Sequence, residues 1–262
     1  MPVLDPSLHR QLSQAISPGP RAECFRQQRG VRSAAARRTG RPREGTVRRV
    51  AKALVSGVGL ALALPWIIYA RAGAVTLGEG PYNHAAFALS VVPGYLGLAV
   101  RRAFYRWTLA QCNWDIYVGF GSAFTHPTAR VGRRVWVGAY SLIGRCDIAD
   151  DAVIGSRVSI LSGRHQHGFS SRDLPISQQQ RVFTEVRIGR DSWLGEGCII
   201  MADLGEGCVV GAGSVVVKPA EDFWIIAGNP ARQIGVRGAA TPDTAASDAA
   251  HCEADSVGVL RG

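Results

Sequence analysis

The chain has 262 residues, enough for one sizeable domain with appendages, and its formal net charge is +10. Most of this charge lies in residues 1–50, where eleven arginines outnumber three acidic residues and give +8. The remainder of the chain is close to neutral, so its basic character belongs to a tail and not to a nucleic-acid-binding fold. We therefore expect no nucleic-acid partner.

Both ends of the chain have the composition of disordered tails. Residues 1–50 are rich in Arg, Gln, Ala, Gly and Pro, and residues 238–262 are rich in Ala, Asp and Ser. Segments with few large apolar residues bury too little surface to offset the entropy of folding. The six cysteines show no paired spacing, which favours a reduced compartment over a disulfide framework.

Two apolar stretches in residues 51–107 predict a helical hairpin. Residues 53–70 include eighteen uncharged positions and residues 85–100 include sixteen, whereas about 20 apolar residues are needed to cross a bilayer as a helix. Pro65 and Pro93 would kink the two helices. We expect the hairpin to dip into a membrane or to cross it twice. The alternative is a pair of helices packed on the rest of the chain or in an oligomer.

Basic residues flank both outer ends of this hairpin, and the positive-inside rule puts such ends on the cytoplasmic side. They are Arg48, Arg49, Lys52, Arg101, Arg102 and Arg106.

An aliphatic residue followed by a small residue recurs from Val131 onwards, mostly at steps of six. The aliphatic residues are Val131, Val137, Ile143, Ile148, Ile154, Ile160, Ile188, Leu194, Ile200, Leu204, Val210 and Val216. A period of six fits neither a helix nor an alternating strand. It predicts a solenoid in which each step supplies one short strand and one corner.

The repeat stops at Ile160 and resumes at Val186, so the loop 162–185 must leave the coil. Long insertions of this kind are usually functional. His165 and His167 lie in this loop, and neutral histidine can accept a proton near physiological pH. The loop is therefore the candidate catalytic segment.

Three phrases of the repeat region resemble the hexapeptide-repeat acyltransferase family. They are Val186 to Gly195, Val209 to Lys218, and the Gly-Asn-Pro-Ala-Arg segment Gly228 to Arg232. The resemblance covers roughly half the chain and is nearest to the exopolysaccharide and maltose or galactoside O-acetyltransferase branch. It implies a mainly β fold, a left-handed parallel β-helix over residues 112–237, preceded by the apolar hairpin and the basic tail.

The same resemblance implies an acetyl-CoA co-substrate, a saccharide acceptor of exopolysaccharide or lipopolysaccharide biosynthesis, and a homotrimer with sites between subunits. The implied coenzyme-binding residues are Trp193, Gly195, Ala212, Val217, Lys218 and Arg232. This sequence departs from the family at Glu196, where relatives often have a small residue, and at Val217, where threonine is usual.

Gly163-Arg164-His165 matches the catalytic phrase of the family, so His165 is the favoured general base. His167 is the alternative. A carboxylate could orient the histidine, and the sequence leaves Asp173, Glu185 and Asp115 open. The nucleophile is the acceptor hydroxyl, and no metal is expected.

The phrase Pro-Gly-x-x-Gly…Arg-Arg-x-Phe-Tyr, from Pro93 to Tyr105, resembles that of membrane-associated polysaccharide enzymes. We therefore expect the cytoplasmic face of the bacterial inner membrane and a lipid-linked acceptor, with the cytoplasm as the alternative. Competing functions are N-acetylation of an amino-sugar nucleotide, O-acetylation of serine, a carbonic anhydrase with three metal-binding histidines, and a non-catalytic β-helix scaffold.

Overall fold

The computed structural model describes residues 46–164 and 166–238. The tails predicted over residues 1–50 and 238–262 lie almost entirely outside these ranges. The first described helix already begins at Thr46, a few residues before the boundary predicted at residue 51.

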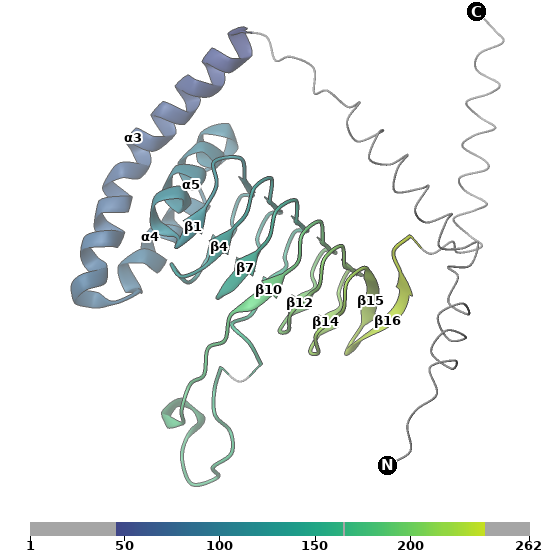
Figure 1. Ribbon diagram of the computed structural model, residues 1–262. Coiled ribbons are helices and arrows are strands. Elements are labelled where there is room, and N and C mark those ends of the chain that lie inside the picture. The colour runs from purple at the N-terminus through teal and green to yellow at the C-terminus, as the bar shows by residue number, and fades with distance from the viewer. Residues whose placement is uncertain (1–45, 165, 239–262) are drawn as a thin grey trace, which may run out of the picture. The chain divides into compact units, whose positions relative to one another are not determined.

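Three helices precede the solenoid (Figure 1): α3 (Thr46–Leu77), α4 (Gly80–Ser90) and α5 (Gly94–Thr108). Pro65 lies inside α3 without ending it. Pro93 is the N-cap residue of α5, and the residue before a proline avoids the helical conformation. The second arm expected over residues 85–100 is consequently split between α4 and α5.

Residues 111–236 form a parallel β-solenoid of about six turns, which confirms the architecture predicted from the repeat. Its short strands stack into three sheets (Figure 1). The first sheet contains β1 (Gln111–Cys112), β4 (Arg130–Val131), β7 (Cys146–Ile148) and β10 (Val186–Ile188). The second contains β2 (Tyr117–Val118), β5 (Trp136–Val137), β8 (Val153–Ile154), β11 (Trp193–Leu194), β13 (Val209–Val210), β15 (Trp224–Gly228) and β16 (Ala231–Val236). The third contains β3 (Ala123–Phe124), β6 (Leu142–Ile143), β9 (Ser159–Ile160), β12 (Ile199–Ile200) and β14 (Val215–Val216).

The aliphatic residue of every repeat step points into the coil. All twelve, from Val131 to Val216, are buried, and Leu204 has the largest exposed fraction, 3%. Full burial of such a side chain stabilises a fold by roughly 1.5–3 kcal/mol. The free thiols of Cys146, Cys198 and Cys208 are also buried in the coil.

The solenoid begins one coil before the first repeat step recognised in the sequence. Cys112, Val118 and Phe124 are buried and point inward. They stack in register on Val131, Val137 and Ile143 of the next coil. Cysteine and phenylalanine replace two aliphatic residues in this coil, so the repeat pattern alone does not reveal it.

Aromatic side chains join the helices to this first coil. Tyr82 of α4 stacks on Phe104 of α5, with ring centroids 5.7 Å apart. Tyr105 meets Phe104 at 5.4 Å and Phe124 of the coil at 5.0 Å. In the region 85–100, Leu89 and Val100 are buried, whereas Phe87, Val91, Tyr95 and Leu96 are exposed. α4 and α5 contact the first coil and so close the N-terminal end of the solenoid.

Arg101, one of the basic residues at the outer end of the predicted hairpin, is buried. Its side chain is 3% exposed and donates hydrogen bonds to the carbonyl oxygens of Leu89, Ser90, Val92 and Val118. The last carbonyls of a helix have no partner within the helix. Arg101 supplies donors to the end of α4 and links α5 to β2.

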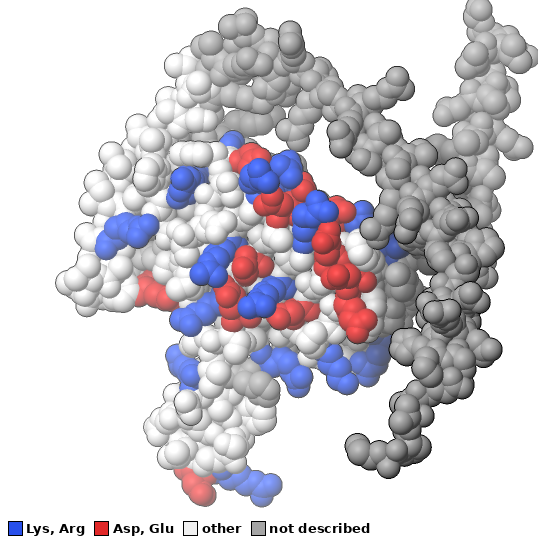
Figure 2. Space-filling view, viewed as in Figure 1, with Lys and Arg blue, Asp and Glu red and all other residues white. Residues whose placement is uncertain are grey.

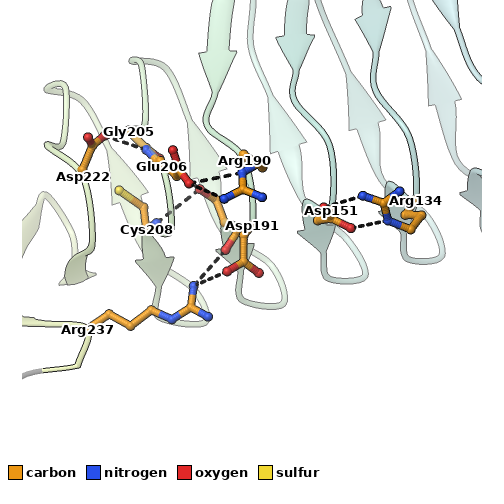
Figure 3. Close-up of polar contacts among 10 residues, drawn as sticks. Arg134, Asp151, Arg190, Asp191, Gly205, Glu206, Cys208, Asp222 and Arg237 are labelled. Carbon is orange, nitrogen blue, oxygen red and sulfur yellow. Dashed lines mark hydrogen bonds and ion pairs between the residues drawn. The ribbon is translucent and has the colours of Figure 1, made fainter. Parts of the chain in front are cut away.

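Paired charges line the corner that follows the first sheet (Figure 2). Arg134 and Asp151 of neighbouring coils form two hydrogen bonds, one of them 2.7 Å long between Nη2 and Oδ2. Arg190 pairs with Glu206 at 2.7 Å, and Figure 3 shows both pairs. The hydrogen bond from Arg134 lowers the pKa of Asp151. These pairs stack one coil on the next and balance charge locally.

Candidate active site

The loop 162–185 leaves the solenoid at the corner that follows the third sheet, as the break in the repeat predicts. β9 ends at Ile160 and β10 begins at Val186. Figure 1 shows the loop projecting from the coils beside β10, and one 3-10 turn, Ile176–Gln178, lies within it. Its two legs meet where the Thr184 amide donates to the Ser162 carbonyl at 3.0 Å.

Of the two candidate histidines, the structure describes only His167. His165 lies outside the described residues. Its neighbour Arg164 donates from Nη1 to the carbonyl oxygen of Val217 at 3.2 Å. His167 is exposed and lines a cavity of about 290 Å³ within the loop, together with Gly168 and Gln179. An imidazole beside such a cavity can exchange a proton with a bound hydroxyl.

Val217 and Lys218 follow β14, at the same corner from which the loop departs. Val216 stacks on Ile200, which stacks on Ile160 at the end of β9. The Arg164 contact therefore joins the start of the loop to the coil that the resemblance assigns to the coenzyme. Lys218 is exposed, and its ammonium is a suitable partner for a phosphate group.

Trp193, Gly195 and Ala212 lie near the preceding corner, between the second and third sheets. A Cβ atom at Gly195 would lie 2.5 Å from the Ala212 nitrogen, so the stacking of these coils requires glycine. Trp193 is 55% exposed. Strand β14 of the third sheet lies between this corner and Lys218. Within one chain, the proposed coenzyme-binding residues therefore lie at two different corners of the solenoid.

Two further positions named by the resemblance are Arg232, a proposed coenzyme-binding residue, and Glu196, where the sequence departs from the family. Arg232 is exposed on β16. Glu196, the departure from the family pattern, lies 2.8 Å from Arg157 of the preceding coil, measured from Oε1 to Nη2. Its carboxylate is thus paired along the corner between two coils.

Among the described residues, no hydrogen bond or ion pair joins His167 to any of the three carboxylates left open by the sequence. Glu185 lies 3.9 Å from Arg130, between Oε1 and Nη1. Asp173 is exposed and its amide donates to the hydroxyl of Ser171. Asp115 is exposed before β2. In the parts of the chain that the structure describes, no group of three His, Cys, Asp or Glu could hold a metal ion.

A second cluster, which the sequence did not indicate, lies at the same corner on the first two coils. We call Glu79, His126, Arg145 and Phe183 the corner cluster. His126 Nδ1 lies 2.7 Å from Glu79 Oε2, and Arg145 Nη2 lies 4.0 Å from Glu79 Oε1. The Phe183 ring lies 5.6 Å from the His126 ring and 5.4 Å from the Arg145 guanidinium.

The repeat could have revealed part of this cluster. His126 and Arg145 each follow an inward residue of the third sheet by two positions, Phe124 and Ile143, so the register stacks them. Glu79 precedes His126 by 47 positions and lies between two helices, where no period applies.

Comparisons with known proteins give partial matches. No protein-family model matches the chain. Serine acetyltransferase 4 of Arabidopsis thaliana is 34% identical over 114 residues, which cover 42% of this chain and 28% of that protein. A protein of Escherichia coli named "Putative lipopolysaccharide biosynthesis O-acetyl transferase WbbJ" is 35% identical over 94 residues, which cover 33% of this chain and 48% of that protein. The chain spans less than half the length of these two curated relatives.

A solved structure supports the fold. The maltose O-acetyltransferase of Clostridium difficile superposes with a TM-score of 0.53 at 22% identity, over 59% of this chain and 84% of that one. At this identity the likeness concerns the fold. The sequence relatives of this chain are acetyltransferases of the hexapeptide-repeat type, and the chain has the β-solenoid that its own repeat predicts.

Proposed function

We propose that the chain is an acetyl-CoA-dependent O-acetyltransferase that modifies a saccharide hydroxyl in exopolysaccharide or lipopolysaccharide biosynthesis. The contact between Arg164 and the Val217 carbonyl carries this proposal. It joins the histidine-bearing loop to the coil of Val217 and Lys218, which resembles the coenzyme-binding coil of hexapeptide-repeat acyltransferases. The relatives named as a serine acetyltransferase and as a lipopolysaccharide biosynthesis O-acetyl transferase support the reaction class.

The reaction needs a general base and stabilisation of the oxyanion. The hydroxyl oxygen of the acceptor forms a bond to the acetyl carbonyl carbon while a loop histidine takes the hydroxyl proton. The carbon–sulfur bond then breaks, and the proton passes to the leaving thiolate. The products are the sugar acetate and the free coenzyme thiol. His165 is the proposed base, and His167 is the alternative.

A homotrimer would complete the coenzyme site. Trp193 and Lys218 lie at different corners, so one chain does not bring them together. The second sheet also exposes an apolar row, in which Trp136 is 49% exposed and stacks on Tyr117 at 3.8 Å. Exposed apolar patches of this kind mark interaction sites. A second copy on this face would cover the row, and the site would combine Trp193 of one subunit with Lys218 of the next.

The outer face of α3 supplies the proposed membrane contact. Ala53–Leu77 is the one segment in residues 46–164 and 166–238 that is long and apolar enough to cross a membrane by length and composition. Gly59, Ala63, Ile67 and Ala70 are buried in a narrow stripe toward the other helices. The other side of the helix exposes large apolar residues, which are Leu54, Val58, Leu62, Leu64 and Ile68.

The packing of α3 favours a helix lying in the membrane surface over a hairpin that crosses twice. A Cβ atom at Gly59 would lie 2.7 Å from the Ala99 Cβ, and Arg71 donates to the Trp107 carbonyl at 2.6 Å. α3 therefore stays beside α5, which packs on the first coil. We place its outer face in the interface, on the cytoplasmic side of the bacterial inner membrane, where acetyl-CoA and a lipid-linked acceptor are both accessible.

Acetyl transfer can be tested with purified protein, acetyl-CoA and a panel of methyl hexopyranosides, lipid-linked glycans, an amino-sugar nucleotide and serine. We expect thiol release that depends on a saccharide, together with a sugar product heavier by one acetyl group in mass spectrometry. Acetylation of only serine or only the amino group would contradict the proposed acceptor. Absence of transfer to every acceptor would contradict the enzyme class.

A further inference from the structure

The corner cluster brings together residues from four separate segments. Glu79 lies in the turn between α3 and α4, His126 follows β3, Arg145 follows β6, and Phe183 belongs to the returning leg of the loop 162–185. The cluster thus connects the helices, the first two coils and the loop that carries His167. It lies on the same corner as Arg164 and Lys218, on the first two coils instead of the last.

The contact with Glu79 orients His126. The 2.7 Å separation of Nδ1 and Oε2 is a hydrogen bond in which Nδ1–H donates to the carboxylate. In a neutral imidazole this tautomer leaves Nε2 as an acceptor. The His126 side chain is 16% exposed, and that of Glu79 is 38% exposed. The pair is therefore accessible to a small ligand at one edge.

The charges of the cluster indicate an uncharged ligand. Arg145 lies within 4.0 Å of Glu79, and nearby Arg130 lies 3.9 Å from Glu185. A free phosphate or carboxylate would have to displace one of these acids. A polyol can instead donate a hydroxyl to His126 and accept hydrogen bonds from Arg145. Phe183 offers an aromatic face for the apolar side of a ring.

A cavity of about 260 Å³ adjoins the cluster at Glu79. Its lining includes Arg71, Tyr82 and Pro127, the residue that follows His126. The Tyr82 hydroxyl is buried and has no hydrogen-bond partner within the described structure. Sites for drug-sized ligands span roughly 300–1,000 Å³, so this cavity has room for one sugar ring and not for an oligosaccharide.

We propose that the corner cluster and this cavity form the acceptor subsite, which holds one uncharged sugar ring. The His126 Nε2 atom accepts a hydrogen bond from a ring hydroxyl, and Phe183 lies against the ring. This assignment rests on the O-acetyltransferase function proposed above. It places the sugar between the end of α3, which supplies the proposed membrane contact, and the loop that supplies the proposed base.

The test uses the full-length protein, with the methyl hexopyranoside that is acetylated fastest as the probe. His126→Asn retains a donor near the Nδ1 position for Glu79 but removes the Nε2 acceptor, so the anchor to the α3–α4 turn is preserved. Phe183→Leu removes the aromatic face, and Phe183→Tyr should restore it. Ile176→Ala, an exposed apolar residue of the same loop, is the matched control.

We expect His126→Asn and Phe183→Leu each to raise the acceptor KM about tenfold, the effect of losing one hydrogen bond or one aromatic contact. The KM for acetyl-CoA, the melting temperature and the kcat should change little, and Phe183→Tyr and Ile176→Ala should behave as the unchanged protein. A large fall in kcat at constant acceptor KM would overturn the subsite by making His126 part of the chemistry. An unchanged acceptor KM would overturn it as well.

Saturation-transfer NMR with the methyl hexopyranosides and free coenzyme A separates this inference from the proposed function, because it needs no turnover. If no sugar is acetylated but the signal is present and is lost in His126→Asn, the subsite stands and the O-acetyltransferase proposal fails. If sugars are acetylated and the variants retain the full signal, the subsite fails alone.

Discussion

The Nε atom of Arg101 donates to the carbonyl oxygen of Val118 at 3.0 Å, a hydrogen bond that ties helix α5 to the first coil. The Nη1 atom of the same guanidinium serves the carbonyls at the end of α4, with Val92 nearest at 2.8 Å. Burial lowers the pKa of Arg101 from its usual value. One charged side chain thereby supplies donors to carbonyls of a helix end and of a strand. Two of these carbonyls also accept from the backbone, Ser90 from the Gly121 amide at 2.8 Å and Leu89 from the Val92 amide at 3.4 Å.

Arg101→Met should lower the free energy of unfolding by about 3 kcal/mol or more, because buried carbonyls lose a charged donor. Urea unfolding followed by circular dichroism measures this loss. Arg190→Met is the control, since Arg190 is 60% exposed and pairs with Glu206 at the surface, where ion pairs contribute about 0–1 kcal/mol. Equal losses in the two variants would show that Arg101 does not support the fold.

Gly138→Ala should destabilise the solenoid by roughly 1–3 kcal/mol, the usual cost of overpacking. A Cβ atom there would lie 2.5 Å from the carbonyl carbon of Gly155 in the next coil. Gly197→Asn is the control, because Gly197 has a φ of +69° with open space around it and asparagine tolerates that conformation. Thermal unfolding of both variants tests the difference, and a stable Gly138→Ala protein would refute the stacking argument.

The stability of the fold should fall at alkaline pH. Burial raises the pKa of the Cys112 and Cys198 thiols to about 12, whereas thiols in an unfolded chain ionise near about 8.5. Between these values the unfolded state binds fewer protons than the folded state, so raising the pH favours unfolding. The effect is absent below about pH 8 and approaches about 1.4 kcal/mol per pH unit for each thiol above pH 9.

Urea unfolding at pH 7.5, 9 and 10 checks this dependence. A variant carrying Cys112→Ala and Cys198→Ala should be less stable at pH 7.5 but should lose less stability as the pH rises. The same slope in both proteins would mean that other groups cause the alkaline loss.

The catalytic assignment separates base and coenzyme residues by kinetics. His165→Ala should lower kcat by roughly 10²–10⁴-fold, as expected for a positioned general base, and should leave the acetyl-CoA KM nearly unchanged. Lys218→Ala should show the reverse, with a raised acetyl-CoA KM and a retained kcat, because it removes uniform binding. Steady-state thiol release measures both. An inactive His167→Ala beside an active His165→Ala would assign the base to His167.

Membrane contact through α3 should depend on its outer face. Val58 and Leu62 are 52% and 49% exposed and lie outside the buried stripe. A variant carrying Val58→Gln and Leu62→Gln should lose at least tenfold in vesicle binding, since each apolar side chain contributes about 1.5–3 kcal/mol when fully buried. Its melting temperature should change little.

Flotation with vesicles of phosphatidylethanolamine and phosphatidylglycerol tests this binding, and Leu174→Gln, an exposed change in the loop, is the control. Flotation of the α3 variant at the level of the unchanged protein would rule out this face as the membrane contact.

The sequence predicts the solenoid well because each aliphatic residue of the repeat is a residue that the fold buries. Val131 to Val216 keep one inward aliphatic residue per step, and the loop interrupts that pattern where it leaves the coil. Pro93 marks a boundary, but only the structure shows that the residues on either side pack against the first coil. From the sequence, Arg101 resembles a charge that flanks an apolar segment, because the carbonyl oxygens that accept its hydrogen bonds come from other segments and are not evident in the sequence.

The corner cluster illustrates the second limit. The spacing of Phe124 and Ile143 could have stacked His126 above Arg145. Glu79 reaches them through the packing of α3 and α4, which depends on contacts such as Gly73 against Pro81. No periodic signal encodes such a contact, so tertiary packing determines which carboxylate meets the histidine.

Helices α4 and α5 cover the first coil of the solenoid, and the antiparallel strand β16 covers the C-terminal edge of the second sheet beside β15. Stacked parallel strands present unpaired backbone groups at each end, and such edges recruit further strands. The two helices and β16 therefore block edge strands that could otherwise pair with another copy of the chain and extend the solenoid into a filament. We expect a chain cut before Gln111 or after Lys218 to assemble end to end, even though every remaining coil is unchanged.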